Sequence, residues 1–446
     1  MQIPLPLRSP RRTSRKRLKD MTWRRGGRAA RMTGSGLGQR TDRHWFSLHA
    51  VLVALLISAL PTASNATPCG EVQGLENFHK AIEDVEGGVR SRPLTILHLG
   101  DSHIALDSFT RGLRNRWTET FGNAGRGLMP GVPFRYYAPD GFKLEMRGNW
   151  DVASSLAADA SGPFGIQGFR ASSADKNAVM GVHSESAVSR VVIDVYGTPH
   201  SGALLLKLGN AASLKLSTRR DVPGLIQLSV PAANVHEVRL MPAGTGDVHV
   251  LGWNFLSSGS PGMRYDSFGV VAATANITRR WDRQTVHAQI GAMKPDLVIL
   301  GFGTNEGFNN GLDLEAYREL ASSFAGEIKE AAPDASIALL GPFDGARQGT
   351  GEACGDGWMT PPKLDGVRGV LRDVAAAHGY FFWDGGAAMG ERCASNEWAK
   401  ADPPLMYADR VHLRPAGAER LAGALWNALM EQEKQGSSCG RPSGPG

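Results

Sequence analysis

Five short apolar runs separated by stretches of helical periodicity constrain the fold of this chain more than any other feature of its sequence. Uninterrupted runs of this length are typical of strands that are buried on both faces of a parallel sheet. They occupy 94–99, 267–271, 296–300, 336–340 and 380–383. The helical patterns around them supply the crossovers that parallel strands need. We therefore predict an α/β fold of three layers, in which helices cover both faces of a parallel sheet.

The segment between about residues 130 and 262 has a different pattern. Helical periodicity is lost there, and short alternating segments separated by turn residues take its place. Six of them have strand character, at 190–196, 203–208, 213–217, 225–230, 237–241 and 248–255. We predict that they form a β-sandwich or jelly-roll domain inserted into the α/β domain.

The N-terminal region has the pattern of an export signal. Residues 1–66 contain 13 Lys and Arg against two Asp, whereas the whole chain carries only +6, so the remainder is mildly acidic. An uncharged apolar run at 50–60 follows, and then small residues that end at Ala66. A run this short favours a signal peptide cleaved near Ala66 over a membrane anchor.

Two expectations about location and partners follow from this signal. We expect an exported protein of the periplasm or cell envelope, with no stable membrane insertion after cleavage. The positive charge is confined to the signal, which argues against a nucleic-acid partner. The oligomeric state is left open by the sequence.

These patterns divide the chain into five segments. Residues 1–66 are the basic region and signal peptide, 67–129 the first part of the α/β domain, and 130–262 the inserted β domain. The second part of the α/β domain covers 263–434. The Gly- and Ser-rich residues 435–446 form a flexible tail.

Four cysteines follow the predicted cleavage point: Cys69, Cys354, Cys393 and Cys439. An even number in an oxidising compartment predicts two disulfides, for which three pairings are possible. A bond between Cys354 and Cys393 would close a long loop, and one between Cys69 and Cys439 would join the two ends. Free buried thiols are the alternative. No zinc-type spacing such as C-x-x-C occurs, and we expect no metal and no cofactor.

The first group of chemically capable residues follows the first predicted strand, as Gly100-Asp101-Ser102-His103. A serine at the carboxyl end of a strand and the start of a helix has an exposed hydroxyl and a free backbone N–H. His103 either packs beside this serine or contributes to the site.

A matching acid and base occur just before the last helix, at Asp409 and His412. Their spacing lets one short turn bring the carboxylate to Nδ1 of the imidazole, which leaves Nε2 for Ser102. Such a pairing selects the required tautomer and stabilises the imidazolium formed on proton transfer.

A third group, Gly303-Thr304-Asn305-Glu306, follows the strand at 296–300. The Asn305 amide can donate a hydrogen bond to a developing oxyanion. The backbone N–H of Ser102 and one from the turn at 269–273, where Gly269 and Ala272 are the candidates, complete an oxyanion hole.

Through these motifs the chain resembles the SGNH (GDSL-like) hydrolases. The sequences GDSH at 100–103, the turn near Gly269, GTNE at 303–306 and DRVH at 409–412 occur in the family's order. The resemblance implies a flavodoxin-like parallel sheet, a triad of Ser102, Asp409 and His412, and an oxyanion role for Asn305. Where this family often has Gly in the second motif, the chain has Ala272.

Within that family the chain looks like the peptidoglycan O-acetylesterase branch, because GDSH is combined with a long β insertion similar to a carbohydrate-binding module. The segments 121–137 and 401–413 add to the likeness. We expect an esterase that removes O-acyl groups, in first place O-acetyl, from an envelope polysaccharide such as peptidoglycan. A lipase, thioesterase or acyltransferase with the same triad, or a non-catalytic glycan-binding protein, are the alternatives.

Overall fold

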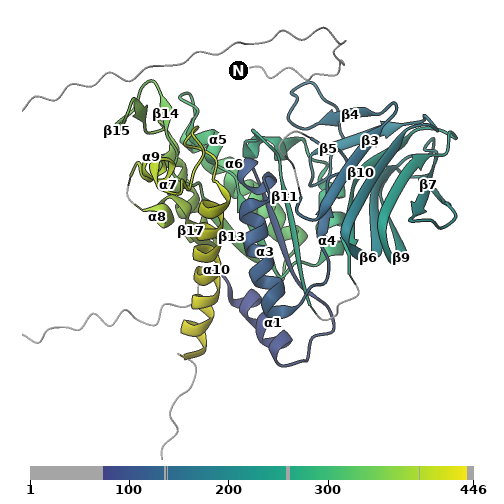
Figure 1. The fold of residues 1–446 in the computed structure, drawn as a ribbon, viewed down its shortest axis with the longest axis horizontal. Coiled ribbons are helices and arrows are strands. Elements are labelled where there is room, and N and C mark those ends of the chain that lie inside the picture. The colour runs from purple at the N-terminus through teal and green to yellow at the C-terminus, as the bar shows by residue number, and fades with distance from the viewer. Residues whose placement is uncertain (1–73, 135–136, 138, 258–261, 391, 439–446) are drawn as a thin grey trace, which may run out of the picture. The chain divides into compact units, whose positions relative to one another are not determined.

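The computed structural model describes residues 74–134, 137, 139–257, 262–390 and 392–438 (Figure 1). The predicted signal peptide with its cleavage point, Cys69, Cys439 and the end of the predicted tail lie outside the described residues. No helix among those described is long and apolar enough to cross a membrane.

A five-stranded parallel sheet forms the centre of the α/β part. Its strands follow the order β11-β1-β12-β13-β17, and every neighbouring pair is parallel. This is the strand order of flavodoxin-like sheets, in which the first strand of the sheet lies second from the edge. The strands are β1 (Leu94–Gly100), β11 (Met263–Gly269), β12 (Leu297–Gly301), β13 (Ser336–Gly341) and β17 (Phe381–Asp384). The predicted parallel sheet is confirmed.

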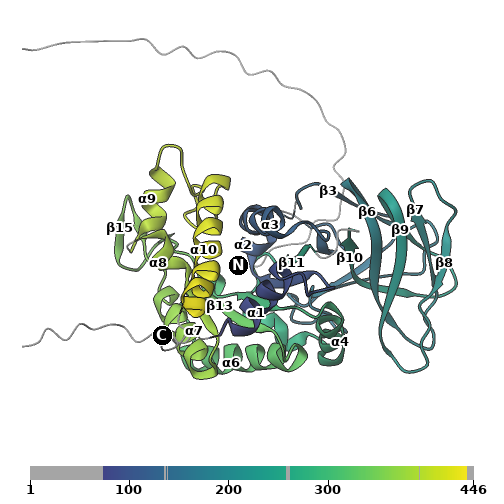
Figure 2. The ribbon, with the colours of Figure 1, turned by 90° about the horizontal axis from the view of Figure 1, so that it is seen from below.

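Helices cover both faces of this sheet and complete the predicted three layers (Figure 2). One face packs on α4 (Arg283–Met293), α6 (Leu314–Ala331) and α7 (Leu364–His378). The other packs on α1 (Glu76–Glu86), α3 (Ser108–Phe121) and α10 (Pro415–Ser438).

Strand β1 shows why its sequence is an apolar run. Leu94 and Ile96 are buried in one of the two cores, and Leu97 and Leu99 are buried in the other. Successive side chains of a strand point to opposite faces, so a strand covered by helices on both sides is mainly apolar on both faces. The exceptions in β1 are Thr95 and His98, which are also buried, and His98 is 2.6 Å from the Tyr265 hydroxyl.

Residues 127–256 build a second sheet of nine antiparallel strands. They are β2 (Gly127–Met129), β3 (Phe142–Arg147), β4 (Asp151–Ser154), β5 (Phe169–Ser173), β6 (Val179–Gly197), β7 (Ala203–Leu208), β8 (Leu214–Ser217), β9 (Gly224–Pro242) and β10 (Val248–Leu256). All six predicted segments fall in strands, and β9 joins two of them. The predicted two-sheet sandwich or jelly roll is not confirmed, because the ladder hydrogen bonds connect all nine strands into one sheet.

The antiparallel sheet is fixed to the α/β part through buried polar and apolar contacts. Asp194 in β6 accepts hydrogen bonds from Gln289 of α4 at 2.8 Å and from Gln227 at 2.9 Å. Burial raises the pKa of Asp194, although both amides oppose this effect. The ring of Phe169 packs edge-on against Phe268 of the parallel sheet. The two sheets are therefore held together by a continuous interior.

A small subdomain lies between β13 and the last helix. It contains a three-stranded sheet, α8 (Gly385–Met389) and α9 (Ala394–Lys400), and the strands are β14 (Arg347–Gln348), β15 (Ala353–Gly355) and β16 (Trp358–Met359). A disulfide joins Cys354 to Cys393, with the two Cα atoms 5.3 Å apart. This bond is one of the pairings that the sequence left open.

Candidate active site

Two glycines at strand ends allow the segment carrying Ser102 to lie directly on the sheet. The short helix α2 (Ser102–Ala105) starts there, with Asp101 as N-cap, whose carboxylate accepts from the His103 N–H at 3.0 Å. A Cβ on Gly100 would lie 2.4 Å from the Gly301 carbonyl, and one on Gly269 would lie 2.3 Å from the Asp101 carbonyl. The structure therefore gives Gly269 a packing function, while its place in the oxyanion hole stays a prediction.

The three residues predicted as a triad lie in one hydrogen-bonded chain. Ser102 Oγ is 3.1 Å from His412 Nε2, and His412 Nδ1 is 2.7 Å from Asp409 Oδ2. The other oxygen of Asp409 accepts from the backbone N–H groups of Val411 and His412, each at 3.0 Å. Ser102 is 5% exposed, whereas the Asp409 and His412 side chains are more open to solvent.

The electrostatics of Asp409 suit an orienting carboxylate. Partial burial opposes its ionisation, but the hydrogen bonds from His412 and Val411 outweigh burial and lower the pKa of Asp409 to about 2. The group is therefore charged at neutral pH and can stabilise an imidazolium at His412.

Asn305 lies in the short helix α5 (Thr304–Gly307), directly after β12. Its Nδ2 donates to the Ala273 carbonyl at 2.7 Å, which brings the third motif onto the turn after β11. An amide nitrogen carries two hydrogens, so one remains for another acceptor. The bond fixes the orientation of the amide, and its role toward an oxyanion stays a prediction.

Ala272 stands in that same turn with a left-handed backbone, at φ 62°. A residue with a Cβ is disfavoured in this conformation by about 1–2 kcal/mol, and glycine is not. This explains why the second motif of the resembling family often has Gly here. Ala272 is exposed and retains its backbone N–H, so it is a candidate oxyanion donor as predicted from the sequence.

Glu306 is the first site residue whose function the sequence did not reveal. Its side chain is 3% exposed, and Oε1 accepts from the Ala275 N–H at 2.6 Å. Burial raises the pKa of Glu306 to about 7. Asn305 and Glu306 thus hold the carbonyl of Ala273 and the amide of Ala275, one on each side of the same turn. In the sequence, the only indication that Glu306 belongs to the site is its position directly after Asn305 in GTNE.

Glu306→Gln is expected to stabilise the protein at pH 8 and to leave its stability at pH 4 unchanged. The pKa of this carboxyl rises from 4.5 to about 7 on folding. Its contribution to the free energy of unfolding is therefore fully present below pH 4.5 and is lost as the pH rises through about 7. Gln keeps an acceptor for Ala275 without a charge to desolvate. Urea unfolding should show a gain of about 2–3 kcal/mol at pH 8. Identical pH profiles for the variant and wild type would contradict this account.

His103 forms a buried link between the serine segment and the histidine loop. Its Nδ1 is 3.3 Å from Asp101 Oδ1, and its Nε2 is 2.9 Å from the Val411 carbonyl. Burial lowers the pKa of His103, but Asp101 and the Val411 carbonyl outweigh burial and raise it. The sequence left the function of His103 open, and the structure places it as a support between α2 and the loop of His412, with the two imidazole rings 5.6 Å apart.

In the described part of the chain, no three His, Cys, Asp or Glu side chains gather where they could hold a metal ion. The expectation of chemistry without a metal or cofactor stays a prediction.

One family and several solved structures are similar to this chain. Residues 246–420 match the GDSL-like Lipase/Acylhydrolase family, a stretch that includes Asn305, Asp409 and His412. Ser102 precedes that stretch, because the antiparallel sheet separates it from the other motifs. A solved structure of a peptidoglycan O-acetylesterase is similar with a TM-score of 0.67 at 21% identity, over 80% of this chain and 96% of that one.

Two further solved structures are similar with lower scores. A family two carbohydrate esterase from Clostridium thermocellum, in complex with cellohexaose, matches with a TM-score of 0.29 at 13% identity, over 66% of this chain and all of that one. The acetyl xylan esterase AlAXEase matches with a TM-score of 0.29 at 18% identity, over 37% and 80% of the two chains. No curated protein matches the sequence significantly.

The sheet order defines this part of the chain as a three-layer α/β domain of the flavodoxin-like type. The chain resembles the SGNH (GDSL-like) hydrolases, as its four motifs predict, and in fold it resembles a peptidoglycan O-acetylesterase.

Proposed function

We propose that the protein is a serine esterase that removes O-acyl groups, in first place O-acetyl, from an envelope polysaccharide such as peptidoglycan. The observation that carries this proposal is the continuous chain from Asp409 through His412 to Ser102 at the carboxyl end of the parallel sheet. Two similarities support it: residues 246–420 match the GDSL-like Lipase/Acylhydrolase family, and the fold resembles that of a peptidoglycan O-acetylesterase.

The geometry supports a two-step acyl transfer to water. Ser102 Oγ attacks the ester carbonyl while His412 Nε2 takes its proton, and Asp409 stabilises the imidazolium. The oxyanion receives hydrogen bonds from the Ser102 N–H, the free Asn305 hydrogen and the turn at Ala272. His412 then donates its proton to the leaving sugar hydroxyl. A water molecule, deprotonated by His412, then attacks the acyl carbonyl. The bond to Ser102 Oγ breaks, His412 returns the proton to Oγ, and the acyl group leaves as a carboxylic acid.

The remaining segments have a place in this proposal. Residues 1–66 direct export to the periplasm or cell envelope, where an acylated polysaccharide is the partner. The antiparallel sheet, which holds none of Ser102, Asn305, Asp409 and His412, engages the glycan in the manner of a carbohydrate-binding module. The two parts at 67–129 and 263–434 form the hydrolase.

Acetate release from two O-acetylated polymers, compared with the hydrolysis of long-chain aryl esters, tests the substrate class. We expect release from O-acetylated peptidoglycan to exceed release from O-acetylated xylan by at least about tenfold in kcat/KM, with little hydrolysis of long-chain aryl esters. Ser102→Ala serves as the blank for chemical deacetylation. Preference for the long-chain ester would replace the proposal with a lipase, and preference for xylan would change the polysaccharide.

A further inference from the structure

Arg410 lies inside the loop that carries both the acid and the base of the site. It follows Asp409 with a left-handed backbone, at φ 54°, and its N–H donates to the Tyr407 carbonyl at 3.1 Å. Its own carbonyl accepts from the Ala346 N–H at 3.0 Å. A non-glycine residue keeps such a conformation only where its surroundings hold it. The shape of the loop from Asp409 to His412 therefore depends on what holds Arg410.

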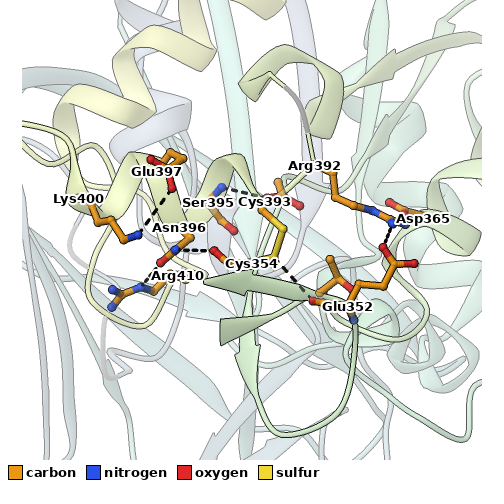
Figure 3. The surroundings of a disulfide bond; sticks show 12 residues. Glu352, Cys354, Asp365, Arg392, Cys393, Ser395, Asn396, Glu397, Lys400 and Arg410 are labelled. Carbon is orange, nitrogen blue, oxygen red and sulfur yellow. Dashed lines mark hydrogen bonds and ion pairs between the residues drawn. A yellow bond between two sulfur atoms is a disulfide. The ribbon is translucent and has the colours of Figure 1, made fainter. Parts of the chain in front are cut away.

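The Arg410 side chain contacts the disulfide subdomain beside Asn396 (Figure 3). Its Nε donates to Asn396 Oδ1 at 3.3 Å. Its guanidinium lies over the ring of Trp358, with Cζ 4.3 Å from the ring centroid. A hydrogen bond and a cation–π contact from two different elements thus hold this side chain, and its Nη1 also donates to the Ala408 carbonyl at 2.5 Å within its own loop.

The disulfide joins the two elements that hold Arg410. Cys354 belongs to the β15–β16 hairpin that carries Trp358, and Cys393 is the N-cap of α9, which carries Asn396. Asn396 is fully buried and donates from Nδ2 to the Cys354 carbonyl at 2.8 Å. The disulfide therefore restrains the distance between the Trp358 ring and the Asn396 amide, the two groups that contact the Arg410 side chain.

We propose that Arg410 is a positioning residue for the Asp409–His412 pair and that the Cys354–Cys393 disulfide holds it in place. The inference rests on the proposed function, since it concerns the same triad. Among the described residues, no hydrogen bond joins the guanidinium to Ser102, so we infer that it acts through the loop. It fixes the loop so that the Asp409 carboxylate remains 2.7 Å from the imidazole.

Arg410→Ala is the first test, with an aryl acetate as substrate. We expect kcat to fall about 10- to 100-fold with KM within about twofold, because a small misplacement of a catalytic group slows chemistry without weakening substrate binding. Arg420→Ala is the matched control. Arg420 also lies over a ring of α9, 5.2 Å from the centroid of Trp398, and in the described structure no hydrogen bond or ion pair joins its side chain to the loop. Equal losses in the two variants would overturn the proposal.

A double-mutant cycle with Asp409→Asn separates positioning from general support of the fold. If Arg410 acts through Asp409, removing it in the Asn background should cost less than about twofold. Losses that multiply would overturn the proposal. Wild type that hydrolyses no ester, or Ser102→Ala that remains active, would instead overturn the proposed function.

Two remote variants keep the test independent of changes inside the loop. Trp358→Ala, and Cys354→Ser combined with Cys393→Ser, should each lower kcat at least about threefold with the circular-dichroism spectrum unchanged. Activity is not the only readout. The ¹⁵N shifts of His412 should report one tautomer in wild type and in Arg420→Ala, and a mixture of tautomers in Arg410→Ala. A single tautomer in all three proteins would contradict the inference.

Discussion

Ser102→Ala is expected to lower kcat/KM for an aryl acetate by about 10⁴- to 10⁶-fold, with little change in the free energy of unfolding. The substitution removes only Oγ, the atom that lies 3.1 Å from His412 Nε2. The backbone N–H that starts α2 is retained, so the helix and its N-cap at Asp101 persist. Steady-state kinetics and urea unfolding on the same preparation measure both effects.

The control for this variant is Ser108→Ala, at the start of the next helix, α3. It removes the same atom from the same segment and should retain wild-type turnover. His412→Ala should be about as inactive as Ser102→Ala, and the double variant should be hardly worse, because groups that act as a unit lose function together. Turnover near wild type in Ser102→Ala would rule out the serine as nucleophile.

Asn305→Ala is expected to lower kcat and kcat/KM together by about 10²- to 10³-fold, with KM nearly constant. The amide meets an oxyanion that the ground-state ester carries only as a weak carbonyl dipole, so the interaction acts on the transition state. The variant also loses the hydrogen bond to the Ala273 carbonyl, which should reduce stability by about 1 kcal/mol.

Asn305→Asp separates the effect of the hydrogen-bond donor from the effect of the side chain's size and shape. The carboxylate has the size of the amide but offers no hydrogen to the oxyanion or to the Ala273 carbonyl, so this variant should be at least as slow as Asn305→Ala. A raised KM at unchanged kcat in Asn305→Ala would assign the residue to substrate contact. Kinetics on one aryl acetate series decides between these outcomes.

The sequence predicted those features that depend on local patterns. The runs 94–99 and 336–340 became central strands because apolar side chains on both faces leave few other solutions. The motifs carrying Ser102 and Asn305 were placed correctly because each directly follows such a strand. In a parallel sheet all carboxyl ends meet at one edge, so motifs far apart in sequence converge.

Strand β11 shows where local patterns fail. The run at 267–271 predicted a strand that starts four residues later than the observed one, Met263–Gly269. Arg264 and Asp266 mark this stretch as polar in sequence, yet they form a largely buried ion pair, with Nε 2.6 Å from Oδ2. The pattern of apolar and polar residues in a sequence does not distinguish a buried charge that is paired with a neighbour from a charge that is exposed to solvent.

The functions of Glu306 and His103 could not be predicted for a similar reason. Glu306 bonds to Ala275, 31 residues earlier, and His103 bonds to Val411, 308 residues later. Burial, which raises the pKa of Glu306, is likewise a property of the assembled fold. The choice among the possible cysteine pairings also required the fold, because only there do Cys354 and Cys393 meet.

The central claim is that Ser102 is the nucleophile of an esterase, and covalent labelling tests it most directly. A fluorophosphonate loses fluoride as a serine oxygen bonds to phosphorus, so the modified residue can be located by peptide mass spectrometry. We predict one adduct, on the peptide that contains Ser102, which is absent in Ser102→Ala and formed much more slowly in His412→Ala. An adduct on a different serine, or a wild-type protein that hydrolyses aryl acetate yet takes up no label, would contradict the account.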